Sequence, residues 1–448
     1  MRALPLVLSI VACAAATAST PPDLPLFHGC HDGFINWIKK NPEPEASPLR
    51  LVSIDCVGIS SDSYYPTSVS PNGAAVQHWS SGYIQHFNIA PLGEPGGVQL
   101  VNKVTYRTLA SHDPSGAAPD AIAWSVDSGA LWSVRQAVNP SGFAITGLTP
   151  IKLGLDGSIH DLPLLRHAAG PLDGIMWVGG EGKAVALFGW RGGYYKPEHD
   201  DPEPTLAIID ASTGKILDSL PVRTIPTFKD RLPAYGVTHS IGSATGAILP
   251  DGRVRTVLHM NRWIERPQGG SNKREDIIRH TDFWLEWTQG EAPQEWRDSY
   301  ASDWLKPAVL SADGSKLLVM RELQPNGVQV FDCDDCKVTP PTPVTGTIAE
   351  LIDVVTRRAL WTLPATATQF WSQRTPPAIS PDGRYGLFQL PPSDMRRPIA
   401  LVDMRNGRII QTIAPSMVGS YADSFGFTKE GKRVWVATAN VVRIYSFD

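Results

Sequence analysis

Polar turns alternate with short apolar runs along most of this chain. Seven times, a polar turn that ends in glycine is followed directly by a run of apolar, β-prone residues. Glycine takes the positive φ that a tight hairpin requires, so we expect each turn to join two antiparallel strands. The seven turns span residues 70–73, 126–129, 179–182, 249–252, 311–314, 380–383 and 428–431.

The runs that follow the turns are mostly apolar without interruption, as in 184–188, 317–320 and 434–437. Strands that pack on both faces between neighbouring sheets have this composition. One hairpin cannot bury its apolar face alone, whereas similar sheets around a common axis can. The pattern predicts an all-β fold, a seven-bladed β-propeller of four-stranded antiparallel blades. Counts of six or eight blades stay open, because the turn at 179–182 is a weak match.

A second strand–turn–strand unit follows in several repeats, at 206–220, 351–363 and 399–413. An aspartate closes the first strand of each unit, and we expect its carboxylate to cap the backbone of the turn. A catalytic role is the alternative for these aspartates. These residues are Asp210, Asp353 and Asp403.

Two segments carry a resemblance to known propeller families. Ser380-Pro-Asp-Gly-Arg384 and the segment 403–413 resemble the repeats of YVTN-type propellers, and the Ser-Pro-Asp-Gly turn is also similar to that of TolB-type propellers. The resemblance covers most of the mature chain and implies blades rather than a particular chemistry. The chain contains neither Tyr-Val-Thr-Asn nor the Trp-Asp signature of WD40 repeats, so no functional subfamily is assigned.

The last repeat ends one strand short, because the chain stops after Val441–Phe447. The apolar segment 49–57 is suited to supply the missing outer strand, and this pairing would remove exposed sheet edges. We therefore expect a signal peptide at 1–18, an N-terminal extension at 19–48, and a propeller domain at 49–448.

The N-terminus indicates export. Arg2 precedes an apolar run at 3–16, and Ala16-Thr-Ala18 offers a cleavage site for a signal peptidase. A second interpretation stays open, because Ile10-Val-Ala-Cys13 resembles a lipobox and would place a lipid anchor at Cys13. No later stretch of about 18 apolar residues exists, so no transmembrane span is expected.

Four cysteines remain in the mature chain, and an even number in an oxidising compartment predicts disulfides. We expect the pairs Cys30–Cys56 and Cys333–Cys336. Three alternatives stay open: a redox Cys-x-x-Cys, a four-cysteine zinc site, and a short metal cluster around His28-Gly-Cys-His31. No metal site is assigned.

Composition excludes some function classes. The chain has 448 residues and a net charge of −4, and 42% of its residues are hydrophobic, which is ample for a large core. Without a basic block, nucleic acid is not an expected partner. No phosphate loop, dinucleotide fingerprint, His-Glu-x-x-His or Gly-x-Ser-x-Gly motif occurs, so neither a cofactor nor a standard catalytic motif is predicted.

Alignment of the repeats on their turns places polar residues at the start of each inner strand. Inner strands of a propeller line the central channel, so these residues are expected to converge at one mouth. They could form a hydrated polar channel, or a pocket for a polar ligand with acid–base groups. The candidates are Tyr65, Asp120, Asp173, His239, Lys306, Arg374 and Asp423.

Aromatic and basic residues in two long loops form a second candidate surface on the rim. Exposed aromatic side chains there could anchor a partner protein or stack on sugars, and core packing is the alternative. These residues are Trp190, Tyr194, Tyr195, Trp263 and Arg266.

These observations predict a secreted or periplasmic β-propeller that binds a protein or cell-envelope ligand through its rim loops. The alternative function is a hydrolase or lyase of small polar or sugar-like substrates, with its site at the channel mouth.

Overall fold

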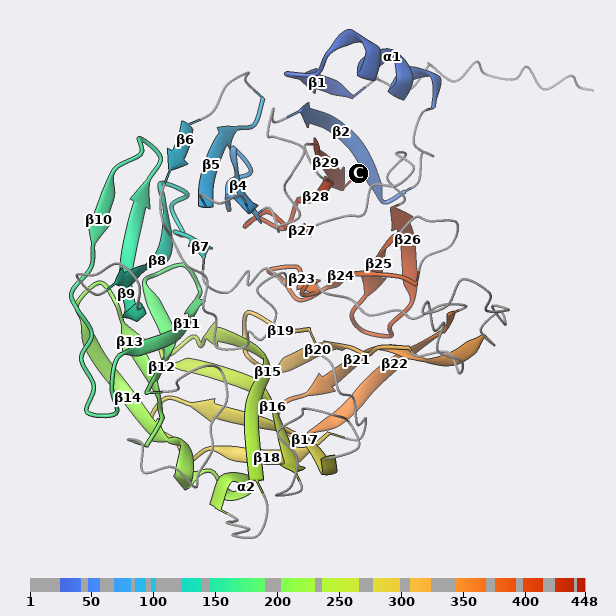
Figure 1. The fold of residues 1–448 in the computed structure, drawn as a ribbon. Coiled ribbons are helices and arrows are strands. Elements are labelled where there is room, and N and C mark those ends of the chain that lie inside the picture. The colour runs from blue at the N-terminus through green and yellow to red at the C-terminus, as the bar shows by residue number, and fades with distance from the viewer. Residues whose placement is uncertain are drawn as a thin grey trace, which may run out of the picture.

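The fold is a ring of β-sheets, seen along its axis in the computed structural model of Figure 1. The N-terminal strands, in blue, lie beside the C-terminal strands, in red, where the ring closes. The structure describes residues 25–41, 47–56, 68–81, 85–93, 98–101, 122–138, 145–189, 203–229, 236–265, 277–298, 307–323, 343–367, 375–391, 398–413, 424–438 and 441–447.

Six sheets are four-stranded and antiparallel, and each uses four consecutive strands. The first three comprise β3 (Ser68–Val69), β4 (Ala75–Ser81), β5 (Gln85–Pro91) and β6 (Val98–Val101); β7 (Ala123–Trp124), β8 (Ala130–Val138), β9 (Ile145–Gly154) and β10 (Ile159–Asp161); and β11 (Leu172–Val178), β12 (Lys183–Phe188), β13 (Thr205–Asp210) and β14 (Lys215–Pro221).

The next three comprise β15 (Gly236–Ile248), β16 (Val254–Glu265), β17 (Ile277–Thr288) and β18 (Gln294–Arg297); β19 (Ala308–Leu310), β20 (Lys316–Met320), β21 (Val344–Asp353) and β22 (Arg358–Ala367); and β23 (Ala378–Ile379), β24 (Tyr385–Gln389), β25 (Ile399–Asp403) and β26 (Ile409–Ile413). A short 3₁₀ turn, η3 (Val222–Thr224), and the short helix α2 (Pro226–Lys229) follow β14.

The closing sheet combines both ends of the described chain. Its strands are β27 (Ser424–Phe427), β28 (Arg433–Thr438), β29 (Val441–Phe447), β2 (Leu49–Cys56) and β1 (Leu26–His28). β2 pairs antiparallel with β29, which confirms that an N-terminal strand completes the last sheet. On the inner side, β27 lies beside β3 and closes the ring.

The prediction of seven four-stranded antiparallel blades is wrong. The described residues form six blades of that kind, and the closing sheet is instead five-stranded and mixed, because β1 runs parallel to β2. Glycine turns in a sequence indicate only those strands that are joined by hairpins. β1 reaches β2 through the helix α1 (Asp32–Lys40) rather than through a hairpin, so its pairing left no turn signature.

The Cys30–Cys56 disulfide is confirmed, and it ties the segment of β1 and α1 to the end of β2. His31 caps α1, because its Nδ1 accepts a hydrogen bond from the Phe34 amide at 3.2 Å. Cys333 and Cys336 lie outside the described residues, as do residues 1–24 with the expected signal peptide and Cys13.

The predicted turns join the first two strands of each sheet and contact one another around the ring. The Val126 amide donates to the Gly180 carbonyl at 3.2 Å, and the Lys429 amide donates to the Pro71 carbonyl at 2.8 Å. At 126–129 the residue with positive φ is Ser128 (62°) rather than the glycine, a departure from the expected geometry. These turns define one end of the ring, which we call the turn face.

The predicted aspartate caps are present. Asp353 Oδ1 accepts from the Thr356 amide at 2.7 Å, and Asp403 Oδ1 accepts from the Arg405 amide at 2.9 Å. The side-chain and backbone hydrogen bonds from Arg405 lower the pKa of Asp403 to about 2. Asp210 caps its turn in the same way, through the amide of Ser212.

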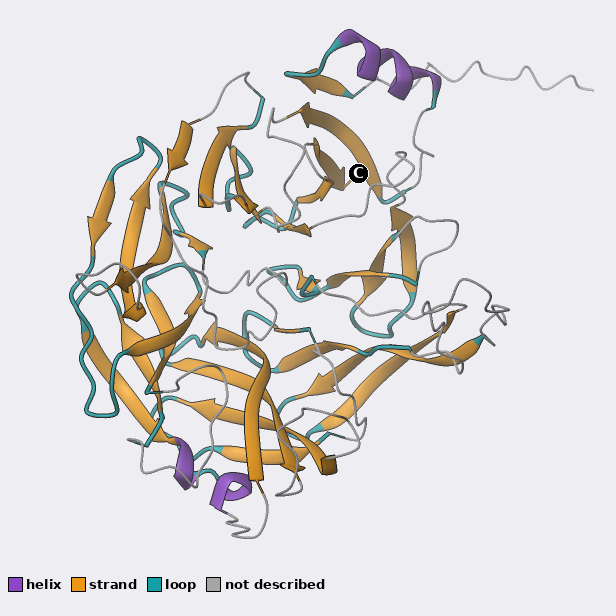
Figure 2. Ribbon diagram, in the orientation of Figure 1, coloured by secondary structure: helices purple, strands orange, loops and turns teal. Residues whose placement is uncertain are grey.

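Apolar side chains fill the spaces between neighbouring blades. One cluster joins Val185 and Ile208 of the β11–β14 blade to Leu258 and Leu285 of the β15–β18 blade. Figure 2 shows that strands make up almost all of the regular structure, so inter-blade packing builds the core.

Candidate functional site

Two of the predicted channel-mouth residues lie in the described chain. Asp173 is the second residue of β11, in a bulge between Leu172 and Gly174, and it is half-buried. His239 lies in β15, opposite Arg262 of β16. β11 and β15 are inner strands of neighbouring blades and lie beside each other.

The other predicted site residues are largely outside the described ranges. Trp263 lies in β16, opposite Thr238 of β15. Neither the polar ring at the channel mouth nor the aromatic rim surface is tested here, and both stay predictions. The positions outside the described residues are Tyr65, Asp120, Lys306, Arg374, Asp423, Trp190, Tyr194, Tyr195 and Arg266.

A buried group of polar residues, three of them charged, joins the β15–β18 blade to the β19–β22 blade. Arg321 Nη1 donates to both carboxylate oxygens of Asp298, at 3.0 and 2.8 Å, and its Nε donates to Glu350 Oε2 at 3.1 Å. His259 Nε2 lies 3.8 Å from Asp298 Oδ2. We call His259, Asp298, Arg321 and Glu350 the ionic network.

All four members of the ionic network are buried, and Arg321 is only 4% exposed. Burial acts to lower the pKa of Arg321, but the carboxylates of Asp298 and Glu350 outweigh this effect and hold it above its ordinary value. The indole of Trp284 also donates to Asp298 Oδ2 at 3.0 Å. The cation is therefore fixed in position by two blades.

The ionic network lies at the ends of two strands, β18 and β20. Asp298 directly follows β18 and Arg321 directly follows β20, at strand ends opposite the turn face. The sequence held one signal for this network: single charged or imidazole residues within apolar strands, as in Leu258-His-Met260 and Ala349-Glu-Leu351. Our sequence reasoning did not use that signal.

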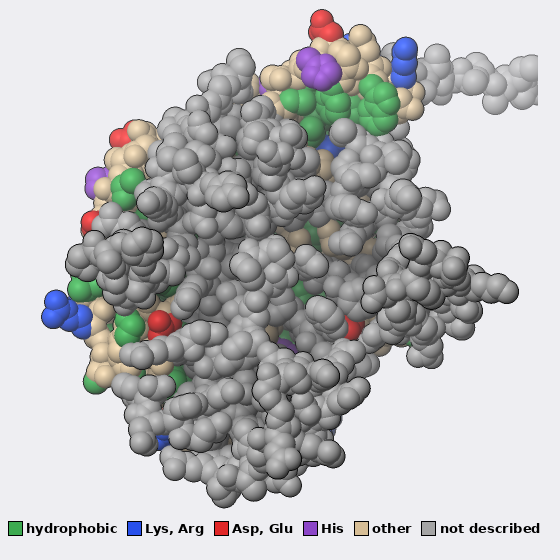
Figure 3. All heavy atoms as spheres, viewed as in Figure 1, with side chains coloured by type: hydrophobic (Ala, Val, Ile, Leu, Met, Phe, Trp, Pro, Cys, Tyr) green, Lys and Arg blue, Asp and Glu red, His purple; other side chains and the backbone are tan. Residues whose placement is uncertain are grey.

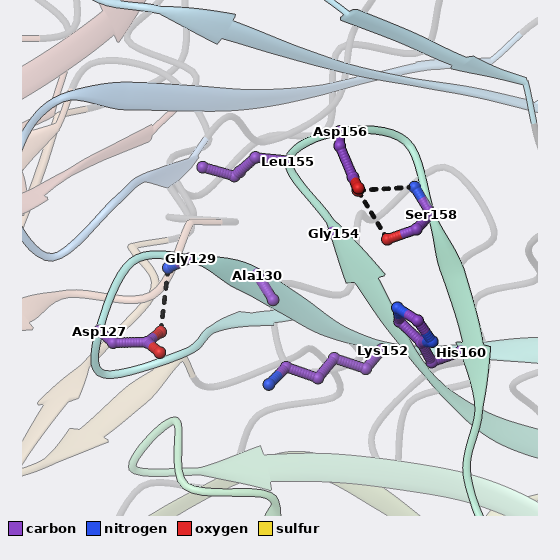
Figure 4. A pocket seen from close by; sticks show the side chains of 9 residues that line it. All are labelled: Asp127, Gly129, Ala130, Lys152, Gly154, Leu155, Asp156, Ser158 and His160. Atoms are coloured by element: carbon purple, nitrogen blue, oxygen red, sulfur yellow. Dashed lines mark hydrogen bonds between the residues drawn. The ribbon is translucent and has the colours of Figure 1, made fainter.

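A hollow of about 440 Å³ opens in the β7–β10 blade, at the level of the turns. We call it the turn-face hollow. Figure 4 shows the side chains of Asp127 and Lys152 pointing toward one another across it, with His160 beside Lys152. Its lining comprises Asp127, Gly129, Ala130, Lys152, Gly154, Leu155, Asp156, Ser158 and His160.

Each aspartate of the hollow is held by its own turn. Asp127 Oδ1 accepts from Ser125 Oγ at 2.5 Å and from the Gly129 amide at 2.9 Å. These hydrogen bonds, with a smaller contribution from the charge of Lys152, lower the pKa of Asp127. The hydroxyl and amide of Ser158 lower the pKa of Asp156 in the same way. Both carboxylates are therefore negative at neutral pH.

Within the described part of the chain, no three His, Cys, Asp or Glu residues gather closely enough to hold a metal ion. None of the helices in that part has the length and apolar character of a membrane span. At the left edge of Figure 3, basic, acidic, histidine and hydrophobic side chains are interspersed, so no single charge dominates that visible edge.

No protein-family model and no curated protein matches this chain. Solved structures that resemble it include the RRP9 WD40 repeats (9% identity, 91% of this chain, 99% of that chain, TM-score 0.48) and U3-55K (10% identity, 90%, 100%, TM-score 0.46). Another is Kuenenia stuttgartiensis hydrazine synthase (14% identity, 87%, 97%, TM-score 0.43). At these scores the similarities carry no inference about activity, and the YVTN or TolB resemblance stays a prediction.

Proposed function

We propose that this chain is an extracytoplasmic binding module, which engages a protein or cell-envelope ligand through the end of the ring opposite the turn face. We call that end the long-connection face. The Cys30–Cys56 disulfide supports the location, because disulfides persist in oxidising compartments.

The observation that carries the proposal is the difference between the two ends of the ring. Because successive strands within a blade alternate in direction, their connections alternate between the two faces. On the turn face the strands are joined by short turns, such as 179–182 and 211–214. The opposite face receives longer connections, including 102–122, 189–204 and 321–343. Long loops positioned by a rigid scaffold are where binding residues concentrate.

The ionic network strengthens this argument. Asp298 and Arg321 stand at the base of the connections 299–306 and 321–343, and Arg321 bonds both Asp298 and Glu350. Buried, charge-assisted hydrogen bonds from Arg321 to these two carboxylates hold the strand ends in one arrangement. We infer that the network fixes the strand ends to which these two connections are attached.

The test shortens connections that the fold can lose. Glu265 pairs with Ile277 across β16 and β17, and Phe188 pairs with Thr205 across β12 and β13, so Asn-Gly turns can replace 266–276 and 189–204. The immobilised chain is incubated with an envelope extract from its own host, cross-linked, and its retained components are measured by mass spectrometry.

We expect the doubly shortened chain to lose the components that the parent chain retains. The matched control exchanges the exposed charges Lys429 and Glu430 on the turn face, and it should retain them. Equal retention by all three chains would overturn the proposal. Turnover of a small polar substrate that Asp173→Asn abolishes would favour the hydrolase or lyase alternative instead.

A further inference from the structure

The turn-face hollow exists because two successive rows of cross-strand neighbours differ in size: the first has large side chains and the next has small ones. Trp132 pairs with Lys152, which pairs with His160, and the next row toward the turns starts with Ala130 and Gly154. Residues two positions apart in a strand share a face, so both rows lie on the same side of the blade. The small residues at 130 and 154 leave an open space next to the row of large side chains of Trp132, Lys152 and His160.

Gly154 keeps this space open and shapes its wall. A Cβ at this position would lie 2.4 Å from Ser158 Oγ and 2.5 Å from Asp156 Oδ1. Any larger residue would therefore displace the hydroxyl–carboxylate contact of the 155–158 turn, which is 2.6 Å long. Because residue 154 has no side chain, Ser158 can form this hydrogen bond and hold Asp156 at the edge of the hollow.

The charges that line the hollow are separated rather than paired. Lys152 and Asp127 face one another in Figure 4, and among the described residues they form no ion pair within 4.0 Å. Lys152 Nζ instead lies 5.1 Å above the ring of Trp132. The hydrogen bonds described for Asp127 use Oδ1, so they leave Oδ2 available to a ligand.

We propose that the turn-face hollow binds a small zwitterion, namely a short peptide or amino acid whose ammonium and carboxylate groups are both free. Its carboxylate is bound by Lys152, and its ammonium group by Asp127 with Asp156 nearby. Asp127 and Asp156 repel a simple anion, and Lys152 repels a simple cation. A ligand with both charges satisfies all three residues through charge-assisted hydrogen bonds.

The first test varies the ligand. Glycyl-leucine is titrated into the full chain and binding is measured by calorimetry, with two matched compounds that each lack one charge. N-acetyl-glycyl-leucine has no ammonium group, and glycyl-leucinamide has no carboxylate. We expect each change to weaken binding by about tenfold or more. Equal affinity for all three compounds, or no binding of glycyl-leucine, would overturn the proposal.

The second test varies the site. In Asp127→Asn the turn should persist, because Asn72 at the equivalent position of the 70–74 turn accepts from Ser70 Oγ at 2.7 Å and from the Ala74 amide at 3.0 Å. The matched control is Asp382→Asn, in an equivalent turn outside the hollow.

We expect Asp127→Asn and Lys152→Met each to weaken binding of glycyl-leucine by about tenfold, and Asp382→Asn to leave it unchanged. Equal weakening by Asp382→Asn would show that the turns act through stability and would overturn the site. Circular dichroism checks that each variant is folded. The hollow and the long-connection face lie at opposite ends of the ring, so either proposal can fail while the other stands.

Discussion

Replacing Arg321 by methionine tests whether the ionic network holds two blades together. Arg321 is 4% exposed, and Asp298 and Glu350 are each 7% exposed, so three charges share one buried site. The substitution removes the guanidinium and leaves two carboxylates buried close to its former position. Removing one partner from a buried ion pair costs about 3–5 kcal/mol of folding free energy, because a buried charge loses its compensation.

The assay is urea unfolding followed by tryptophan fluorescence. Multiplying the change in midpoint by the slope of the transition gives the change in unfolding free energy. A matched control is Arg253→Met, because Arg253 forms ion pairs with Asp251 and Glu291 but its side chain is 40% exposed. We expect the control to unfold close to the parent chain, since water already solvates these charges.

A double variant separates charge from packing. Adding Glu350→Gln to Arg321→Met removes one of the two buried negative charges. We expect this variant to recover part of the lost stability. A loss below about 1 kcal/mol for Arg321→Met would refute the reasoning, because such a value is typical of an exposed pair. So would a double variant whose loss equals the sum of the two single losses.

Three further predictions concern turns and the closing seam. Arg405→Gln should raise the pKa of Asp403 from about 2 toward 3.8, measured by NMR titration; an unchanged pKa would contradict the assigned cause. Because folding lowers this pKa, the contribution of Asp403 to stability is present above pH 3.8 and is lost as pH falls toward 2. Gly180→Ala should lower the thermal midpoint more than Gly252→Ala: both have positive φ, but a Cβ at 180 would lie 2.4 Å from a backbone carbonyl oxygen, whereas nothing lies within 4 Å at 252. Equal decreases in the thermal midpoint would mean that the positive φ alone, and not the contact with the carbonyl oxygen, determines the loss of stability. Gln411→Leu should lower the unfolding free energy by about 1–3 kcal/mol, because the side-chain amide of Gln411 bonds both backbone groups of Leu49, the first residue of β2. Urea unfolding equal to that of the parent chain would show that the attachment of β2 to the neighbouring blade does not depend on Gln411.

Local patterns in the sequence were sufficient for the hairpins. The turn at 380–383 joins β23 to β24, and β24 includes most of the apolar run predicted after it, because glycine geometry and two-sided burial act over a few residues. The apolar composition of 49–57 and the missing strand of the last repeat also predicted a closing strand, which the structure shows as β2. Both inferences needed only neighbouring residues and the requirement that edges be covered.

The sites required information that those patterns lack. Whether Asp127 and Lys152 face each other depends on the register between β8 and β9 and on the small residue at 154. Alignment of the repeats on their turns instead selects polar residues by their place in each repeat. It found Asp173 at the start of an inner strand, but not the charged residues that contact between blades.

The sequence by itself determined the position of the glycine turns and of the hairpins around them, because these follow from short-range backbone preferences. It also determined the role of the N-terminal strand, because the last repeat lacked one strand and exposed sheet edges must be covered. Tertiary structure decided that β1 adds a parallel fifth strand and that Arg321 meets Asp298 and Glu350. Those contacts join strands that no tight turn connects directly. They depend on how blades pack and in which register, and hydrophobic periodicity constrains neither.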